Sequence, residues 1–244
     1  MIFNLFKSKP KLNEIIPKGY VDIHSHILPG IDDGAKNVEE SLKLISEMKK
    51  LGFSKIIGTP HTYRGLYENT NETIKNSYKL LSKNLPKNIN VSYASEYMLD
   101  VSLIEKSIDG SLLCIKENYV LIEMGFLFEP INLYEIIFKI SLNGYIPVLA
   151  HPERYLFLHD DFNKYYKLKN RNCKFQINFL SVIGGYGKEV LNITDKLLKN
   201  NLVDFSGTDI HNMNHIMAIK KNTKIKIKEI DRFKSCLNNN QFFK

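Results

Sequence analysis

The feature that most restricts the fold of this chain is a regular alternation of short apolar runs with longer amphipathic stretches. The runs begin at residues 20, 55, 90, 119, 146, 173 and 203, which is 27 to 35 residues apart. This spacing is typical of one strand, one crossover helix and their loops in a parallel sheet. We therefore predict seven strands at Tyr20–His24, Lys55–Thr59, Asn90–Ser95, Tyr119–Glu123, Ile146–Ala150, Cys173–Asn178 and Val203–Ser206.

The intervening stretches have the spacing of amphipathic helices. In residues 37–51, four apolar residues between Val38 and Met48 share one helical face, with Asn37 as the N-cap and Gly52 after the end. Residues 131–143 and 187–200 follow the same pattern. Because no linker interrupts the chain, we predict a short basic leader at 1–19 and one α/β domain at 20–244. Its basic tail favours a final helix, although the Lys-Ile alternation at 224–228 also permits a strand.

Charge and composition exclude several classes of protein. Of the formal net charge of +8, residues 1–19 contribute +3 and residues 220–244 contribute +6, so the central body is close to neutral. A basic groove for nucleic acid is therefore not expected. No apolar run approaches the roughly 18 residues of a membrane span, and Cys114, Cys173 and Cys236 form no Cys-x-x-Cys. We expect a cytoplasmic protein in a reducing compartment.

Histidines and carboxylates are concentrated where the predicted strands end. In a closed βα barrel these ends open on one face, so the side chains would converge there. Mixed ligation without cysteine suits zinc, manganese or iron, and so many ligands exceed the needs of one ion. We predict two or three divalent ions (Mn, Fe or Zn) held by His24, His26, Asp33, His61, Glu96, Glu123, His151, Asp209 and His211.

Single members of this set also have less specific interpretations. His61 or His151 alone would more often be a loop histidine than a ligand. Glu123 is harder to explain otherwise, because it lies between Ile122 and Met124 and a carboxylate in an apolar strand is rarely buried without a partner. His159 and His215 fall outside the pattern and are expected to be structural or at the surface.

Several segments carry a further signal: residues 22–34 (DIHSHILPGIDDG), Thr59–His61, Glu96, Glu123, His151–Arg154, Gln176–Asn178 and Asp209–Asn212. Together they resemble the polymerase and histidinol phosphatase (PHP) family of metal-dependent phosphoesterases, and within it the tyrosine-protein phosphatases of bacterial capsule and exopolysaccharide biosynthesis. The resemblance covers residues 20–212. It implies a distorted seven-stranded (βα)7 barrel, the TIM-like PHP fold.

The resemblance also implies a site with three ions. His24, His26, Glu96 and Asp209 would hold one ion, Glu96 would bridge to a second ion held by Glu123 and His151, and Asp33, His61 and His211 would hold the third. Catalytic roles would fall to Arg154, Asp209 and His211, with Arg154 binding the phosphate. The family's later arginine is replaced here by residues 212–215 (NMNH). Arg64 is a candidate for the missing charge, although an exposed loop position is commoner for such a residue.

The implied activity is metal-dependent hydrolysis of phosphotyrosine, with a bacterial tyrosine kinase of capsule or exopolysaccharide biosynthesis as the substrate protein. Two alternatives remain: a small-molecule phosphatase, such as one for histidinol phosphate, and a catalytically silent metal-binding regulatory module. A cysteine phosphatase is not expected, because no cysteine begins a Cys-x5-Arg loop; the residues six positions on are Val120, Phe179 and Phe242.

A protein phosphotyrosine would need apolar surface around the metals for its ring. The loops after the first, second and fourth strands offer Ile27–Pro29, Tyr63, Leu66, Tyr67 and Phe126–Phe128. These residues could line the rim of the site or equally belong to the core or to an interface.

Overall fold

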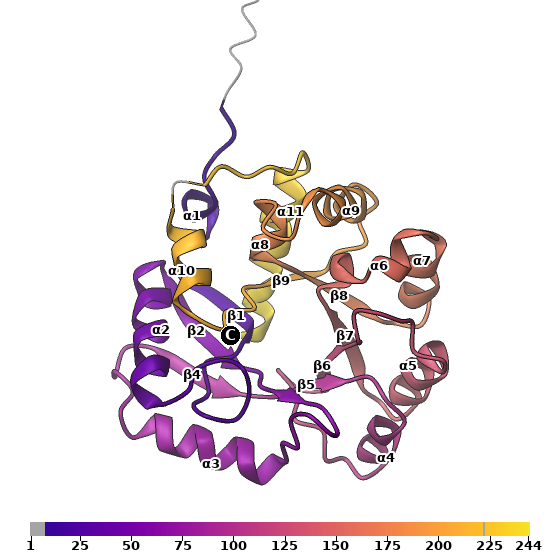
Figure 1. Cartoon of the computed structure of the whole chain (residues 1–244), viewed down its shortest axis with the longest axis horizontal. Coiled ribbons are helices and arrows are strands. Elements are labelled where there is room, and N and C mark those ends of the chain that lie inside the picture. The colour runs from indigo at the N-terminus through magenta and orange to yellow at the C-terminus, as the bar shows by residue number, and fades with distance from the viewer. Residues whose placement is uncertain (1–7, 222) are drawn as a thin grey trace, which may run out of the picture.

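The computed structural model describes residues 8–221 and 223–244, whose strands form a ring enclosed by helices (Figure 1). All seven predicted strands are present, two of them are followed after a break by a further short strand, and every strand pair is parallel. The strands are β1 (Tyr20–Ser25), β2 (Phe53–Gly58), β3 (His61–Thr62), β4 (Asn90–Tyr93), β5 (Glu96–Met98), β6 (Tyr119–Glu123), β7 (Ile146–Ala150), β8 (Lys174–Asn178) and β9 (Phe205–Gly207).

The strands follow one another around the ring in chain order. β1, β2 and β4 form one sheet, and β3, β5, β6, β7, β8 and β9 form the second. The sheets are continuous in the chain, because β2 leads into β3 and β4 leads into β5 within a few residues. At the other edge, the Asp209 N–H donates to the His24 carbonyl (2.8 Å) and the His26 N–H donates to the Ile210 carbonyl (2.9 Å). These bonds close the predicted seven-stranded barrel.

The strands β3 and β5 lie beyond the second and third predicted strands, which ended at Thr59 and Ser95, so the sequence did not predict them. Pro60 separates β2 from β3, and because proline has no N–H to donate, the hydrogen-bond ladder cannot run through it. The short strands β3 and β5 pair with each other, and His61 lies opposite Glu96 in that pair. The interruption therefore brings a histidine and a glutamate from different strands into register.

Helices cover the outside of the ring (Figure 1). The predicted segments 37–51, 131–143 and 187–200 correspond to α2, α5 and α9, and the basic tail contains α11. Asn37 caps α2 as predicted, since its side chain accepts a hydrogen bond from the Glu40 N–H (2.9 Å). The helices are α1 (Leu12–Ile15), α2 (Val38–Lys50), α3 (Asn71–Ser82), α4 (Ser102–Ile108), α5 (Leu133–Leu142), α6 (Leu156–His159), α7 (Asn163–Lys169), α8 (Phe179–Val182), α9 (Lys188–Lys199), α10 (Met213–Lys220) and α11 (Ile230–Asn239), with 3-10 turns η1 (Pro152–Arg154) and η2 (Asn240–Phe243). In the part of the chain that the structure describes, no helix combines the length and apolar character needed to cross a bilayer.

The end of the predicted leader packs against the barrel. Residues 1–7 lie outside the described residues. Leu12 is fully buried and Ile16 nearly so, and both belong to the same apolar cluster as Ile225 and Ile227 of the tail. An isolated antiparallel bridge between Lys11 and Lys224 joins the two segments, in place of the strand that the alternation at 224–228 permitted. Their apolar residues therefore contribute to the core, while their lysines supply the positive charge of both ends.

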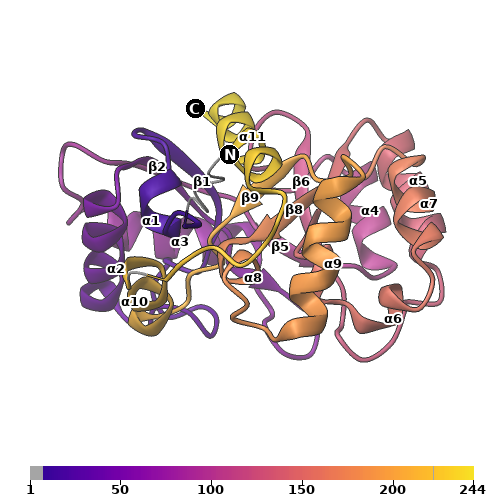
Figure 2. The same ribbon diagram turned by 90° about the horizontal axis from the view of Figure 1, so that it is seen from above.

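The last residues of the chain close one end of the barrel. Figure 2 shows α11 and the C-terminus at the upper edge of the ring and α6, which follows β7, toward the lower edge. Phe243 is fully buried in the barrel's inner apolar cluster, where its ring contacts Phe205 and Tyr119 at the start of β9 and β6. This plug occupies the face from which the strands start, so the opposite face is left for the strand-end side chains.

Asn240 joins the plug to the barrel wall, and its loss should destabilise the fold. Its buried side-chain amide lies 2.9 Å from the Val21 carbonyl and 2.7 Å from the Ser206 carbonyl, and its oxygen accepts from the Ser206 N–H (3.2 Å). Asn240→Ala removes three hydrogen bonds to buried backbone groups, of which the Ser206 carbonyl keeps a bond from the Tyr20 hydroxyl (3.1 Å), so we expect a loss of about 2 to 3 kcal/mol in the free energy of unfolding. Urea denaturation measures this loss, with exposed Asn238→Ala as the control; equal stability of the two variants would contradict it.

Candidate metal centre

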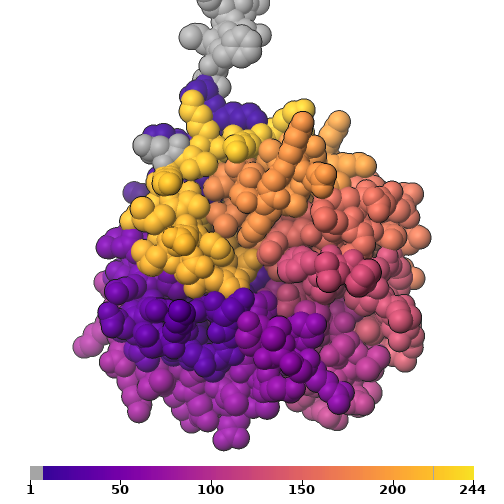
Figure 3. All heavy atoms as spheres, in the orientation of Figure 1, coloured from indigo at the N-terminus to yellow at the C-terminus, as the bar shows by residue number. Residues whose placement is uncertain are grey.

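The structure brings all nine predicted ligand residues together at the C-terminal ends of the strands. They form four overlapping groups whose candidate ligand atoms lie within 4.8 Å of one another in each group: His24, His26 and Glu96; His24, His151 and Asp209; His61, Glu96 and Glu123; and His26, Asp33, His61 and His211. In the space-filling view, segments from the beginning of the chain meet those from its end at the centre of this face (Figure 3). Residues distant in sequence thus converge through the barrel topology.

Glu96 is at the centre of the cluster and belongs to two groups. Its Oε1 lies 3.3 Å from His24 Nε2 and 3.2 Å from His151 Nε2, and its Oε2 lies 3.1 Å from His61 Nδ1. Both oxygens are fully buried, and neither has a hydrogen-bond partner of good geometry among the described residues. A buried carboxylate left in this state is costly unless a cation binds it. Both oxygens are therefore available to bind cations.

Two histidines are held so that their Nε2 atoms face each other. His24 Nδ1 lies 2.7 Å from the Gln176 side-chain oxygen, and His26 Nδ1 lies 2.8 Å from an Asp32 carboxylate oxygen. Because both partners accept, each Nδ1 donates its proton to its partner, so that Nε2 is the atom left with a lone pair whenever the ring is neutral. These two Nε2 atoms are only 3.3 Å apart. Acceptors that orient ligand imidazoles in this way are typical of metal sites.

Asp209 connects this pair to Arg154. Its Oδ1 lies 3.3 Å from the Nε2 atoms of both His24 and His26. Its Oδ2 accepts from the Asn178 amide (2.7 Å) and from Arg154 Nη1 (3.0 Å). The backbone of Asp209 is left-handed (φ +54°), a conformation that aspartate tolerates better than most residues. The carboxylate is therefore fixed on one oxygen and open on the other.

The group of His26, Asp33, His61 and His211 includes Asp33, whose side chain is half-exposed. Asp33 Oδ1 lies 3.3 Å from His211 Nε2 and 3.5 Å from His61 Nε2. Its hydrogen bond with His211 outweighs partial burial and lowers the pKa of Asp33 to about 2. A Glu123 carboxylate oxygen lies 2.7 Å from His61 Nδ1, and both residues belong to the group that includes Glu96. The family resemblance instead implied that Glu123 would share an ion with His151.

The electrostatics of the cluster fit cations. Burial lowers the pKa of His61, yet the neighbouring Glu96 and Glu123 outweigh it and raise that pKa to about 12. Burial also raises the pKa of Asp209, but the His24 and His26 imidazoles hold it well below its usual range. Protons on the imidazoles thus balance the carboxylates. Divalent ions can replace these protons, so the donor set, the two free Glu96 oxygens and the facing Nε2 atoms together fit a site for more than one ion.

Arg154 lies beside the cluster, held between two aromatic rings. Its guanidinium carbon is 4.5 Å from the centre of the Phe126 ring and 4.4 Å from the centre of the Tyr186 ring, close enough for cation–π contact with both. All three residues line a bowl of about 300 Å³ above the predicted ligands. The predicted phosphate-binding arginine therefore faces the same space as His61, His151 and His211.

A larger, apolar cavity opens next to this bowl. It has a volume of about 660 Å³ and is lined by Asp33, His61, Tyr63, Leu66, Tyr67, Met98, Glu123, Met124, Gly125, Phe126, Leu127 and Phe128. The predicted rim residues of the second and fourth strand loops are thus among its walls. For the first loop the structure selects the other alternative: Ile27, Leu28 and Pro29 are buried, the first two in the core with α2 and α10, because that loop folds inward beneath its neighbours.

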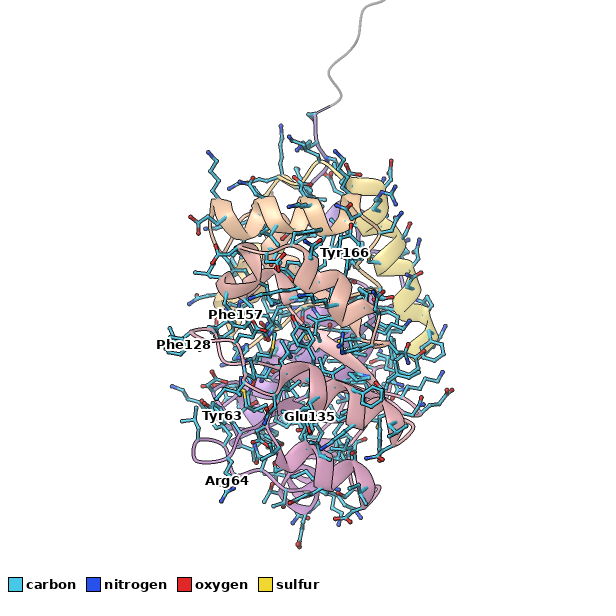
Figure 4. All side chains as sticks on the ribbon, turned by 90° about the vertical axis from the view of Figure 1, so that its right-hand side faces the viewer. Tyr63, Arg64, Phe128, Glu135, Phe157 and Tyr166 are labelled. Carbon is cyan, nitrogen blue, oxygen red and sulfur yellow. The ribbon has the colours of Figure 1, made fainter. Side chains whose placement is uncertain are left out.

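Arg64 does not reach the bowl. It is exposed, and it lines a separate hollow together with Tyr67, Asp100 and Lys106. In Figure 4 its side chain extends away from the molecule below Tyr63. Its position therefore gives no support to a phosphate-binding role, and sequence proximity to His61 alone suggested one.

Some side chains that shape the site had no assigned role in the sequence. Asp32 and Gln176 orient the two facing histidines, and both lie inside segments of the resemblance. Tyr186 follows two glycines in a loop after α8, and no local pattern indicates its contact with Arg154. His215 was expected to be structural or exposed, but it lines the bowl, with its Nδ1 3.3 Å from the His211 N–H nitrogen. His159 is structural as expected, since its Nε2 bonds to the Glu153 carbonyl (2.9 Å).

The three cysteines are free thiols, and none of them lines the bowl or the apolar cavity. Burial raises the pKa of Cys173 and Cys236 to about 12 and that of Cys114 to about 11, so none is a nucleophilic thiolate at neutral pH. We expect a variant with all three replaced by alanine to keep kcat/KM within about twofold of the parent. Steady-state assays on the folded triple variant measure this; a loss of activity with native circular dichroism would implicate a thiol.

Comparison with known proteins agrees with this geometry. A family model described as "Capsular polysaccharide synthesis, CpsB/CapC" matches residues 20–232. Tyrosine-protein phosphatase YwqE of Bacillus subtilis is 31% identical over 197 residues, which cover 79% of this chain and 78% of that protein. The range matched by the family model includes the position of every predicted ligand residue.

Solved structures extend the comparison. A structure from a study of YwqE of Bacillus subtilis and CpsB of Streptococcus pneumoniae, described as unique metal-dependent tyrosine phosphatases, superposes with a TM-score of 0.74 at 30% identity, covering 86% of this chain and 83% of the other. Histidinol phosphate phosphatase of Lactococcus lactis has a TM-score of 0.54 at 14% identity, covering 86% and 95% of the two chains. This second likeness concerns the fold alone.

Proposed function

The chain belongs to the CpsB/CapC family of capsular polysaccharide synthesis, and on this premise we propose that it is a metal-dependent tyrosine-protein phosphatase. The observation that carries the proposal is the cluster around Glu96, in which nine imidazole and carboxylate side chains converge beside Arg154. Intact ligand positions speak against a catalytically silent regulatory module.

The predicted ligand residues are proposed to hold two or three ions of Mn, Fe or Zn. When bound, divalent ions supply a water molecule of lowered pKa as the nucleophile and neutralise charge on the phosphoryl group. Glu96 would bridge neighbouring ions with its two free oxygens. Gln176 and Asp32 keep His24 and His26 in the tautomer that ligation requires, so the chain itself supplies a preorganised site.

Arg154 is proposed to bind the phosphate of the substrate. Its Nη1 donates a hydrogen bond to Asp209, and the other N–H groups of its planar guanidinium can donate to phosphate oxygens. Stacking between Phe126 and Tyr186 restricts its rotation, so less conformational entropy is lost when phosphate binds. Asp209 and His211 line the same bowl and would hold ions beside Arg154.

The apolar cavity is proposed to take the ring of a phosphotyrosine. It shares Asp33, His61, Glu123 and Phe126 with the bowl, so a phosphate in the bowl and a ring in the cavity can belong to one side chain. Phosphoserine lacks a ring to fill this space, and histidinol is polar. The geometry therefore favours phosphotyrosine over the small-molecule alternative.

The proposed substrate protein is a phosphorylated tyrosine kinase of capsule or exopolysaccharide biosynthesis. The proposed location of the reaction is the cytoplasm. The family description supports the pathway, and the three free thiols are compatible with a reducing compartment. Incubating the protein with the phosphorylated kinase encoded in the same genome tests this partner. Retention of its phosphotyrosine, while a short peptide is dephosphorylated, would contradict it.

Two assays test the activity itself. The chelated protein should lose hydrolysis of p-nitrophenyl phosphate and regain it when Mn, Fe, Zn or Co is added, because the nucleophile depends on the ions. The reloaded protein should then show a higher kcat/KM for a phosphotyrosine peptide than for phosphoserine peptides or histidinol phosphate. A tenfold advantage of histidinol phosphate would overturn the protein-phosphatase assignment while leaving a metal phosphatase.

A further inference from the structure

The apolar cavity beside the metal cluster is larger than one tyrosine ring requires. Its volume is about 660 Å³, whereas a cavity of about 150 Å³ is enough for benzene. A phosphotyrosine ring next to His61 and Glu123 would therefore leave most of the space unfilled. The remaining space lies toward the outer wall, which we define as the apolar rim: Leu66, Leu127 and Phe128.

The apolar rim is exposed to solvent to an unusual degree. Leu127 and Phe128 are 81% and 80% exposed, and Leu66 is 62% exposed. Figure 4 shows Phe128 and Tyr63 at the same edge of the molecule, while Glu135 and Tyr166 lie on other elements away from it. Several large apolar side chains gathered around a cavity, rather than scattered singly, indicate a binding surface.

The chemistry of the lining restricts what this surface can bind. The acidic residues and the histidine of the cavity are Asp33, Glu123 and His61, which belong to the metal cluster, and its wall includes no lysine or arginine. A charged residue of a substrate would thus be desolvated there without an ion partner. An apolar side chain would instead bury its own surface together with that of Leu127 and Phe128.

The cavity is continuous with the bowl, which indicates which part of a substrate would reach the apolar rim. The cavity and the bowl share four lining residues, so a group in the outer space lies next to the substrate's reacting side chain. In an extended peptide, neighbouring residues are only about 3.3 to 3.6 Å apart along the chain. Resting on the proposed phosphatase function, we propose that the apolar rim binds an apolar side chain directly next to the phosphotyrosine, which makes the enzyme selective for that sequence context.

The test compares two phosphotyrosine peptides that differ only in having leucine or serine on both sides of the phosphotyrosine. The metal-loaded parent should hydrolyse the leucine peptide with a kcat/KM at least about fivefold higher, because partial burial of leucine is worth that much. The Leu127→Ser/Phe128→Ser variant should bring this ratio close to one. The ratio is the appropriate measure, since both residues also border the space for the ring.

A matched control pair lies on the outer face of α5. Phe138 and Leu142 are also exposed apolar residues, at 54% and 73%, and neither lines the cavity or the bowl. The Phe138→Ser/Leu142→Ser variant should keep the parent's ratio. A drop in the ratio equal to that of the rim variant would mean that loss of surface leucine and phenylalanine in general, not the apolar rim, caused the effect.

The remaining outcomes separate this inference from the proposed function. A parent that hydrolyses both peptides equally would overturn the inference and leave the phosphatase function in place. A parent that hydrolyses neither peptide, although it is loaded with metal, would contradict the phosphatase function itself. A rim variant with an unchanged ratio but a smaller hydrodynamic size would show that the rim binds a second copy of the chain instead.

Discussion

Replacing His24 and His26 together by alanine is expected to lower kcat by at least about 100-fold. The two Nε2 atoms face each other 3.3 Å apart, and each lies within 3.5 Å of Glu96 and Asp209 oxygens. Their loss removes two nitrogen donors that would hold the ions, and under the proposed function those ions would supply the nucleophile. The double variant should also bind less metal than the parent.

The measurement combines steady-state kinetics with elemental analysis of dialysed protein. His159→Ala is the control, because His159 bonds to the Glu153 carbonyl and lines neither the bowl nor the apolar cavity. The control should keep its metal content and its kcat within a few-fold of the parent. A His24/His26 variant that keeps full metal content, or loses less than tenfold in kcat, would show that these residues are not essential ligands.

Arg154→Lys is expected to lower kcat/KM by about tenfold or more, which corresponds to about 1.4 kcal/mol of transition-state stabilisation. The guanidinium stacks between Phe126 and Tyr186 at 4.5 and 4.4 Å while bonding to Asp209. A lysine ammonium is not planar, so it cannot stack on both rings or bind two phosphate oxygens side by side. Metal content should be unchanged, because Arg154 is a cation and not a ligand.

Arg171→Lys provides a matched control. Arg171 also stacks on an aromatic ring, with its guanidinium carbon 4.9 Å from the centre of the Tyr134 ring, but it lines neither the bowl nor the cavity. Its replacement should leave kcat/KM unchanged. If Arg154→Lys had the same kcat/KM as the parent, Arg154 would have a structural role only, and phosphate would have to be bound by other groups.

The sequence by itself determined the seven strand positions around the barrel and the histidines and carboxylates that lie near their ends, although not the two short strands β3 and β5. Runs such as Tyr119–Glu123 and Ile146–Ala150 agree with the structure to the residue, because apolar β-branched runs and their flanking turns are local signals. The strand ends of a βα barrel share one face, so the convergence of His24, Glu96 and Asp209 also followed from the repeat. Local pattern and topology together were enough to predict the cluster.

Only the tertiary structure decided how the rest of the molecule surrounds that cluster. The inward fold of Ile27 and Leu28, the stacking of Tyr186 on Arg154 and the closure of the barrel by Phe243 each join segments far apart in the chain. No local pattern specifies such contacts, because an apolar residue in a loop has the same sequence signal whether it lines a rim or enters the core. Which of the two occurs depends on the free energy of packing against neighbours that the completed barrel provides.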